Sequence, residues 1–235
     1  MFNGVKNLFL DVLFPTLCMQ CKKDGLILCS NCMDSLPSFA PQCISCGIVV
    51  PGSERAPPGR TCLSCRKKTI IYAYISPLQY RNELVRTLIH DYKYRRISSL
   101  HARCVELLIR HIAYYKIIIP SDAIAVAIPL HARRQRVRGF NQAELLAKGF
   151  AERMGISFHT ALVRVRPTVS QMSLPRSLRL TNMSDAFSLS ESADIKGKTI
   201  LLFDDVKTTG ATLEEAARIL KKGGARRVWA MTLAH

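Results

Sequence analysis

Apolar and polar residues follow two different patterns along the chain, and the change falls near residue 69. Before that point the sequence is rich in turns, with few periodic apolar runs and a Pro/Gly stretch at Pro51–Arg60. Beyond it, apolar residues recur at helical spacing in some segments and form continuous runs in others. The pattern predicts helices over Glu83–Tyr94, Leu100–Tyr115, Asn141–Met154 and Leu213–Lys222, and strands over Ala123–Ile128, Thr160–Val165, Thr199–Phe203 and Val228–Leu233.

Strands that alternate with helices are typical of an α/β domain with a doubly wound parallel sheet. One helix carries clear end signals, because Asn141 suits an N-cap, Glu144 stands in capping-box position and Gly155 suits the stop. We expect two parts, a small cysteine-rich module over residues 1–68 and an α/β domain over residues 69–235. The first part is too poor in apolar residues to fold on its own core, so metal ligation must stabilise it.

The overall charge narrows the classes of partner. The 235 residues include 34 Lys and Arg against 17 Asp and Glu, which gives a formal net charge of +17. Hydrophobic residues make up 48%, which argues against global disorder. A balance this basic favours anionic partners, namely nucleic acid, phosphorylated metabolites or an acidic membrane surface.

The cysteines give the sharpest metal-binding signal. Eight of the nine form four Cys-x-x-Cys pairs, and two such pairs supply the four thiolates of a tetrahedral zinc site with no open position. Eight thiolates therefore predict two structural zinc ions. Pairing of neighbours closes the shortest loops and is preferred, while interleaved pairing remains an alternative. The predicted ligands are Cys18, Cys21, Cys29, Cys32, Cys43, Cys46, Cys62 and Cys65.

Reduced thiolates in this number indicate a reducing compartment, so we expect a cytoplasmic protein. The ninth cysteine, Cys104, stands in an apolar stretch and is predicted to be a buried structural thiol. No membrane-spanning segment is predicted. Residues 1–17 carry apolar residues at helical spacing, interrupted by Lys6 and Asp11, and predict a short amphipathic helix that packs on the protein rather than on a membrane.

The richest candidate site is Asp204–Thr212, between a predicted buried strand and a predicted helix. Doubly wound sheets bind ligands at the carboxyl ends of their strands, and a helix start offers N–H groups to a phosphate. Gly210 lets the backbone approach closely, and the threonines add hydroxyl donors. Asp204 and Asp205 can accept hydrogen bonds from a sugar diol, so the loop fits a phosphorylated ribose. An ordinary strand–turn–helix junction with Asp and Thr caps is the alternative.

The segment DDVKTTGAT resembles the phosphoribosyl pyrophosphate (PRPP) motif of type I phosphoribosyltransferases. The resemblance implies that Asp204 and Asp205 bind the ribose 2′- and 3′-hydroxyls. Lys207 stands at a variable position of the motif, where it either adds charge near the phosphate or is solvated. The resemblance gives the 5′-phosphate to the turn formed by Thr208, Thr209, Gly210, Ala211 and Thr212.

Two further blocks resemble the ComF (competence protein F) family. The first reads PLHARR and then RGFNQ over residues 129–142, with Ala132 where many relatives carry proline. With the cysteine pairs, the resemblance covers nearly the whole chain. The second block is matched by Arg164, Arg166, Thr168, Gln171, Leu174, Arg179, Asn182, Ala186 and Phe187.

In the wider fold, the loop after the strand at Ala123–Ile128 holds the pyrophosphate of PRPP. The resemblance gives this role to Leu130, His131, Arg133 and Arg134, and guanidinium groups bind phosphate oxygens bidentately. A solvated basic face is the alternative.

The stretch Pro167–Asn182 resembles a flexible loop that closes over the reacting centre, a common role of long loops. Gln171, Arg176 and Arg179 are its candidate site residues, and the two arginines would reach the pyrophosphate. A plain surface loop is the alternative.

The resemblance leads to two hypotheses of function. In the first, a ComF-like protein binds PRPP with Mg²⁺ and transfers its phosphoribosyl group to an unidentified acceptor, in a role linked to DNA uptake in natural competence. In the second, a zinc-containing protein binds single-stranded DNA or scaffolds the competence machinery, and PRPP is only a regulatory ligand. The basic and aromatic Tyr92–Arg96 is compatible with stacking on a single strand, although a cationic helix end is the preferred interpretation. His131 and His159 receive no acid–base role.

Overall fold

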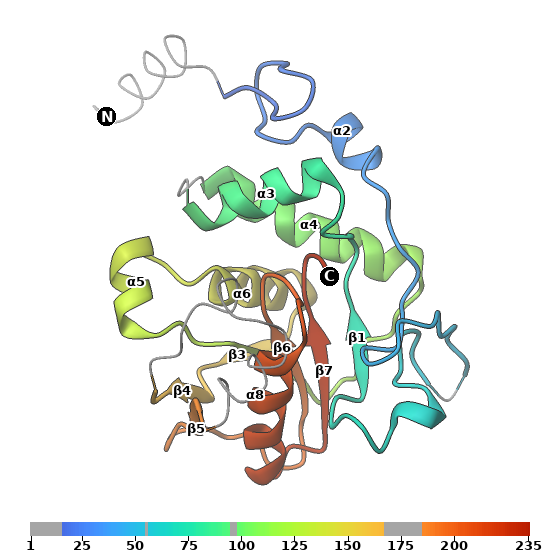
Figure 1. The fold of residues 1–235 in the computed structure, drawn as a ribbon, viewed down its shortest axis with the longest axis vertical. Helices are drawn as coiled ribbons and strands as arrows, with labels where there is room; N and C mark the ends of the chain where they lie inside the picture. The colour runs from blue at the N-terminus through green and yellow to red at the C-terminus, as the bar shows by residue number, and fades with distance from the viewer. Residues whose placement is uncertain (1–15, 55, 95–97, 167–184) are drawn as a thin grey trace.

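The structure, a computed structural model, describes residues 16–54, 56–94, 98–166 and 185–235. A five-stranded parallel sheet in the order β1-β7-β6-β2-β3 forms its centre (Figure 1). Beside it, a small antiparallel sheet pairs β4 with β5. The strands are β1 (Ala73–Ile75), β2 (Ala123–Ala127), β3 (Ser157–His159), β4 (Leu162–Arg164), β5 (Phe187–Leu189), β6 (Thr199–Phe203) and β7 (Arg227–Met231).

Helices cover both faces of the central sheet, which confirms the doubly wound class. On one face, α6 (Gln142–Met154) buries Phe150 in a core that also includes apolar residues of α3 (Glu83–Tyr94) and α4 (Ser98–Tyr114). On the other face, α8 (Ala211–Lys222) contributes to a second core. No helix within the described ranges is long and apolar enough to span a bilayer.

The longer predicted elements are present, and the differences have local causes. The predicted strand Thr160–Val165 is present in part as β4, which pairs with β5 in the small sheet, while β3 lies just before the predicted range and pairs with β2. The helix α5 (Ala132–Arg138) was not predicted, because its polar sequence has no apolar face to signal it. Two short elements of the cysteine segments were not predicted either, because they are too short for a periodic pattern. They are α2 (Ser30–Asp34) and the 3₁₀ turn η1 (Leu63–Cys65). Asn141 and Gly155 cap α6 as expected.

The first cysteine segment, residues 18–36, and the second cysteine segment, residues 43–66, pack against different parts of the α/β domain (Figure 1). The first buries Leu28, Met33 and Leu36 in the core that holds α3 and α4. The second lies beside β1, where Thr61 N–H donates to Tyr72 O at 2.8 Å and Tyr74 N–H donates to Gly59 O at 2.9 Å. These bonds cover the edge of the sheet that β1 would otherwise expose. The division of the chain at residue 68 stays a prediction, and the expected helix over residues 1–17 lies almost wholly outside the described residues.

Candidate functional site

The candidate site lies at the carboxyl ends of two paired strands, β2 and β6. Ala127 is in register with Phe203, and Ile128 N–H donates to Phe203 O at 2.9 Å. From this point the chain leaves β2 toward α6 on one face and leaves β6 toward α8 on the other. Such a topological switch point is where doubly wound sheets bind ligands. The structure therefore brings the loops after residues 128 and 203 to one place.

The loop after β6 is fixed by the C-terminal segment of the chain. Asp204 N–H donates to Met231 O at 3.0 Å, and Lys207 N–H donates to Ala234 O at 2.9 Å. Gly210 has a φ of 84°, which favours glycine, and it forms the N-cap of α8. The turn at residues 208–212 thus leads directly into the amino end of a helix, whose N–H groups and dipole suit an anion.

The acid pair lies between two cations from distant segments. Asp205 Oδ1 is 3.2 Å from Lys93 Nζ, and both side chains are mostly buried. Burial, followed by the charge of Asp205, raises the pKa of Asp204 to about 7, while Lys93 and Arg164 act in the opposite direction. Asp204 Oδ1 also accepts the Asp205 N–H at 2.8 Å. Burial and the neighbouring carboxylate thus favour the protonated form of Asp204, and hydroxyl donors of a ligand or a cation would favour its ionised form.

Lys93 is a site residue that the sequence did not identify. It lies in the last turn of α3, and its neighbours Tyr92 and Tyr94 both interact with other residues of the protein. Tyr92 donates to Gln142 O at 2.8 Å, and Arg138 lies over the Tyr94 ring at 5.1 Å. No local signal separates Lys93 from other lysines at helix ends, since only the packing of α3 places it at Asp205. Tyr92 is thus tied to α6 and Tyr94 to α5, and the interpretation of this segment as a cationic helix end stays a prediction.

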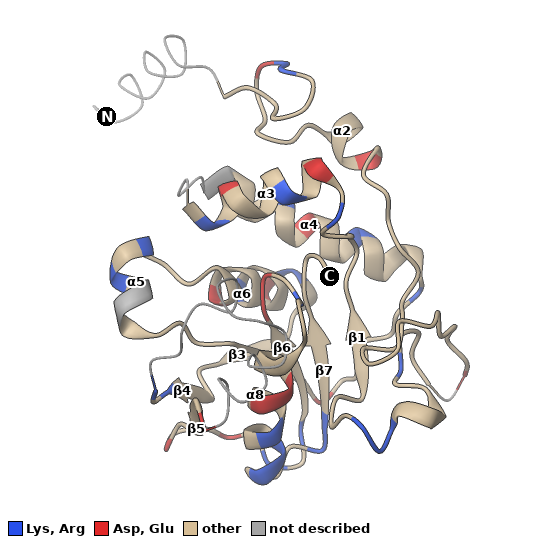
Figure 2. Cartoon of the chain, viewed as in Figure 1, with Lys and Arg blue, Asp and Glu red and all other residues tan. Residues whose placement is uncertain are grey.

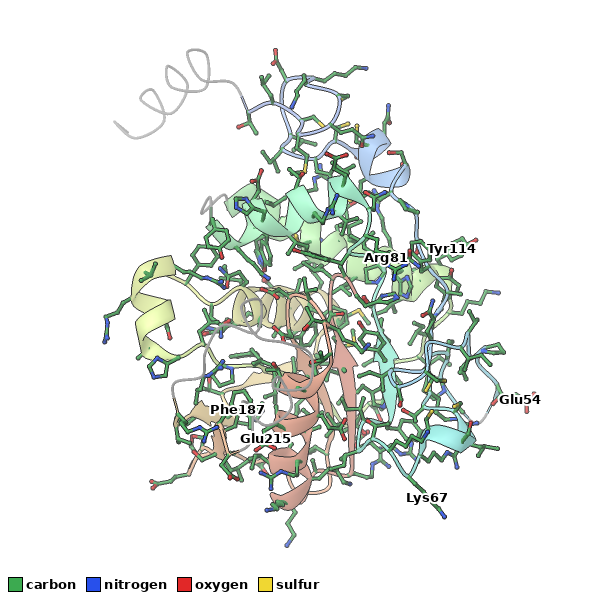
Figure 3. The ribbon with its side chains drawn as sticks, viewed as in Figure 1. Glu54, Lys67, Arg81, Tyr114, Phe187 and Glu215 are labelled. Carbon is green, nitrogen blue, oxygen red and sulfur yellow. The ribbon has the colours of Figure 1, made fainter. Side chains whose placement is uncertain are left out.

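The loop after β2 is anchored by the RGFNQ block and by β4. Asn141 Nδ2 donates to Ile128 O at 3.0 Å, and Arg164 Nη1 donates to Pro129 O at 3.5 Å. The Arg164 guanidinium lies 5.4 Å from the centre of the Phe187 ring, and Phe187 is labelled in Figure 3 near β4 and β5. Asn141 therefore positions the predicted pyrophosphate loop.

The predicted pyrophosphate residues lie at the start of α5. Leu130 and His131 are half-buried and precede the helix, while Arg133 and Arg134 lie within it, with side chains outside the described part of the structure. The predicted loop residues Gln171, Arg176 and Arg179 also lie outside the described residues. Their roles remain predictions.

The eight paired cysteines form two groups of four. Within each group, the four sulfur atoms all lie within 4.8 Å of one another. Within each group one Sγ–Sγ distance is 3.7 Å, between Cys21 and Cys29 and between Cys46 and Cys62. Tetrahedral zinc with Zn–S bonds of about 2.3 Å separates its sulfur ligands by about 3.8 Å. The cysteines therefore fit zinc, and the grouping follows adjacent pairing. The groups are Cys18, Cys21, Cys29 and Cys32, and Cys43, Cys46, Cys62 and Cys65.

The ninth cysteine and two histidines complete the set of residues that the sequence singled out. Cys104 is fully buried, as predicted, and burial raises the pKa of its thiol. His131 lies before α5 and His159 ends β3, so the two histidines belong to different segments.

Comparisons with known proteins agree with this geometry. A family model described as a phosphoribosyl transferase domain matches residues 139–235. DNA utilization protein YhgH of Salmonella typhi is 30% identical over 226 residues, which cover 92% of this chain and 96% of that protein. Competence protein F of Haemophilus influenzae is 32% identical over 241 residues, which cover 94% and 98%. A solved structure, the allosteric regulatory enzyme of purine biosynthesis, aligns over 61% of this chain and 30% of its own, with 18% identity and a TM-score of 0.40.

The parallel sheet with helices on both faces and the matching family model define a type I phosphoribosyltransferase fold. Relatives match over nearly their whole lengths, and the two four-cysteine groups are present. The chain belongs to the ComF family of competence protein F.

Proposed function

We propose that the loop Asp204–Thr212 binds PRPP together with Mg²⁺, and that the protein transfers the phosphoribosyl group to an acceptor. One observation carries the proposal: the acid pair and the amino end of α8 lie at the point where β2 and β6 end together. The acids suit the ribose diol, and the helix start suits the 5′-phosphate. The loop at residues 129–131 is adjacent and suits the pyrophosphate, whose charge Mg²⁺ would neutralise as it leaves.

In the proposed complex, Lys93 exchanges partners. In the structure it pairs with Asp205, and ribose hydroxyls that donate to Asp205 would compete with that contact. Lys93 would then lie beside the departing pyrophosphate. The protein contributes positions and charges, and the acceptor supplies the nucleophile.

Calorimetry with PRPP and Mg²⁺ tests the binding directly. We expect the double variant Asp204→Ala, Asp205→Ala to bind at least ~100-fold more weakly, because two hydrogen bonds to charged groups are lost. A matched control, Glu191→Ala with Asp194→Ala, removes two exposed acids elsewhere and should bind like the wild type. Equal affinity of the acid-pair variant and the wild type would contradict the proposal.

The pH dependence of binding provides a second test. Hydroxyl donors need the ionised form of Asp204, whose pKa is raised to about 7. PRPP affinity should therefore fall as the pH drops from 8 to 6, and Asp204→Asn should bind weakly with little pH dependence. An unchanged pH profile in Asp204→Asn would show that another group controls binding.

We further propose that this activity serves the handling of DNA in a cytoplasmic, zinc-containing protein. The names of the relatives, a DNA utilization protein and a competence protein, support this role. Deleting the gene in its own host and complementing with Asp204→Ala, Asp205→Ala tests it. Restored DNA uptake by that variant would separate the DNA role from PRPP. Binding of PRPP without pyrophosphate release, with DNA present, would instead favour a regulatory ligand.

A further inference from the structure

A basic cleft lies toward the opposite end of the sheet from the loop Asp204–Thr212. A cleft of about 540 Å³ opens between the second cysteine segment, the start of β7 and the end of α8. Figure 2 shows the basic end of α8 and the basic segment after η1 on this side of the molecule. The lining includes Lys221 near the end of α8 and Arg227 at the start of β7, whereas the loop Asp204–Thr212 follows the end of β6 and leads into the start of α8. The two sites are therefore distinct.

Among the residues that the structure describes, the lining of the cleft is basic and contains no acidic residue. Its cations come from three segments that are far apart in the sequence, and they are Arg60, Arg66, Lys221, Arg226 and Arg227. Arg226 pairs with Asp122 at 2.7 Å, and Lys221 donates to two carbonyl groups. Among the described residues, the other three cations have no carboxylate partner. Three cations of the lining are thus not paired with a carboxylate among the described residues.

Arg60 supplies an independent observation that points to an anionic ligand. Its Nε atom is buried and has no hydrogen-bond partner among the described residues. A buried donor without a partner destabilises the protein, and a charged donor does so more strongly. A phosphate oxygen in the cleft is the kind of acceptor that would satisfy it.

The walls of the cleft are held in place before any ligand binds. Thr61 N–H donates to Tyr72 O at 2.8 Å, and its hydroxyl donates to Ile71 O at 2.6 Å. Glu214 of α8, which is not part of the lining, accepts from Thr69 Oγ1 and from Ile70 N–H, both at 2.7 Å. The cations are therefore presented on fixed backbone, which reduces the cost of ordering them on binding.

Aromatic and apolar surface lies among these cations. The Arg227 guanidinium is 4.5 Å from the centre of the Tyr72 ring, and Ile70 is 40% exposed in the lining. Cations interleaved with an aromatic ring in a groove are typical of sites for single-stranded nucleic acid, in which bases stack and phosphates pair. A rigid duplex displays its phosphates on a convex surface, whereas a flexible strand can enter a concave cleft of this size.

We propose that this cleft binds the phosphate backbone of single-stranded nucleic acid through Arg60, Arg66 and Arg227. The inference gives a location to the proposed DNA role and does not depend on PRPP binding. It assigns the two ends of the sheet to different anions, a phosphorylated ribose at the carboxyl end and a polyanionic strand at the amino end.

The test measures binding of a fluorescent 20-nucleotide oligothymidine by anisotropy over a series of salt concentrations. The variant Arg60→Gln, Arg66→Gln, Arg227→Gln should lose at least ~10-fold in affinity, and its salt slope should fall by about 2, since each single-strand phosphate contact contributes about 0.7. The matched control Arg81→Gln, Arg86→Gln, Arg153→Gln removes the same charge from exposed positions outside the cleft. Arg81 is labelled in Figure 3 far from Lys67, which lies near the cleft. An equal loss in both variants, or no loss in the cleft variant, would overturn the proposal.

Further measurements test the cleft in the folded wild-type protein and separate it from the PRPP site. In the wild type, photo-cross-linking with bromodeoxyuridine oligonucleotides should label the peptide that contains Tyr72, and labelling only elsewhere would count against the cleft. Saturation by thymidine monophosphate as tight as by the 20-mer would indicate a small-molecule site and overturn the assignment to a strand. PRPP calorimetry on the cleft variant should match the wild type, so failure here and failure of the PRPP site are distinguishable.

Discussion

The two four-cysteine groups have the same Cys-x-x-Cys pairs but are attached to the molecule in different ways. The first rests on helices through apolar side chains, among them Leu28 and Leu36. The second is joined to the sheet by backbone hydrogen bonds at Gly59 and Thr61, and it forms one wall of the basic cleft. The difference teaches that each four-cysteine group is formed by residues close together in the sequence, whereas its role depends on the part of the domain that it contacts.

The largest expected effect comes from removing one ligand of each group. Cys65→Ser should destabilise the protein by about 4–5 kcal/mol or more, because loss of the metal also frees the edge of the sheet. Cys32→Ser should cost less, since the sheet keeps its edge partner. Metal analysis should fall from two zinc equivalents to one in each variant, and calorimetric melting should rank them. Equal melting temperatures would remove the contrast between the two groups.

Glycine substitutions test the backbone attachment itself. A Cβ at Gly59, where φ is +70°, would lie 2.3 Å from Tyr74 O, so Gly59→Ala should cost about 2–4 kcal/mol. Gly25 in the first group also has a positive φ, but nothing lies within 4 Å of its Cβ position. Gly25→Ala should therefore cost only about 1–2 kcal/mol of backbone strain. Urea unfolding compares the two, and a greater loss at Gly25 would contradict the assigned docking.

A smaller loss of stability is expected at Thr69 and Ile70, which follow the second four-cysteine group in the sequence. Glu214 accepts two hydrogen bonds from Thr69 and Ile70, so Glu214→Gln replaces one acceptor by a donor and should cost about 1–2 kcal/mol. Urea unfolding measures the loss, with Glu191→Gln at an exposed position as the control. If the control loses as much stability, the two hydrogen bonds to Glu214 do not hold Thr69 and Ile70 in place.

The smallest effect is expected at the ion pair between the first group and α4. Arg110 pairs with Asp34, and their side chains are 42% and 63% exposed. Exposed pairs contribute at most about 1 kcal/mol, so Asp34→Asn should change stability by less than that, and less still in high salt. A loss larger than that of Glu214→Gln in the same urea series would mean that polar contacts, rather than apolar burial, hold the first group.

Much of the fold was predictable because its signals are local. The helix over Glu83–Tyr94 and the strand over Thr199–Phe203 have the predicted bounds, since each carries a full periodic or continuous apolar pattern. The three-residue strands β1, β3 and β5 were not predicted, because three residues form no pattern. The helix α5 was missed since its residues are nearly all polar.

The candidate site divides in the same way. The sequence itself determined the acid pair, the threonine turn, Gly210 and the cysteine spacing, since each needs only neighbouring residues to be recognised. The tertiary structure alone placed Lys93 at Asp205 and gathered Arg60 and Arg227 in one cleft. Such contacts join residues that only the packing of helices on the sheet brings together, and no local pattern of residue types encodes that packing.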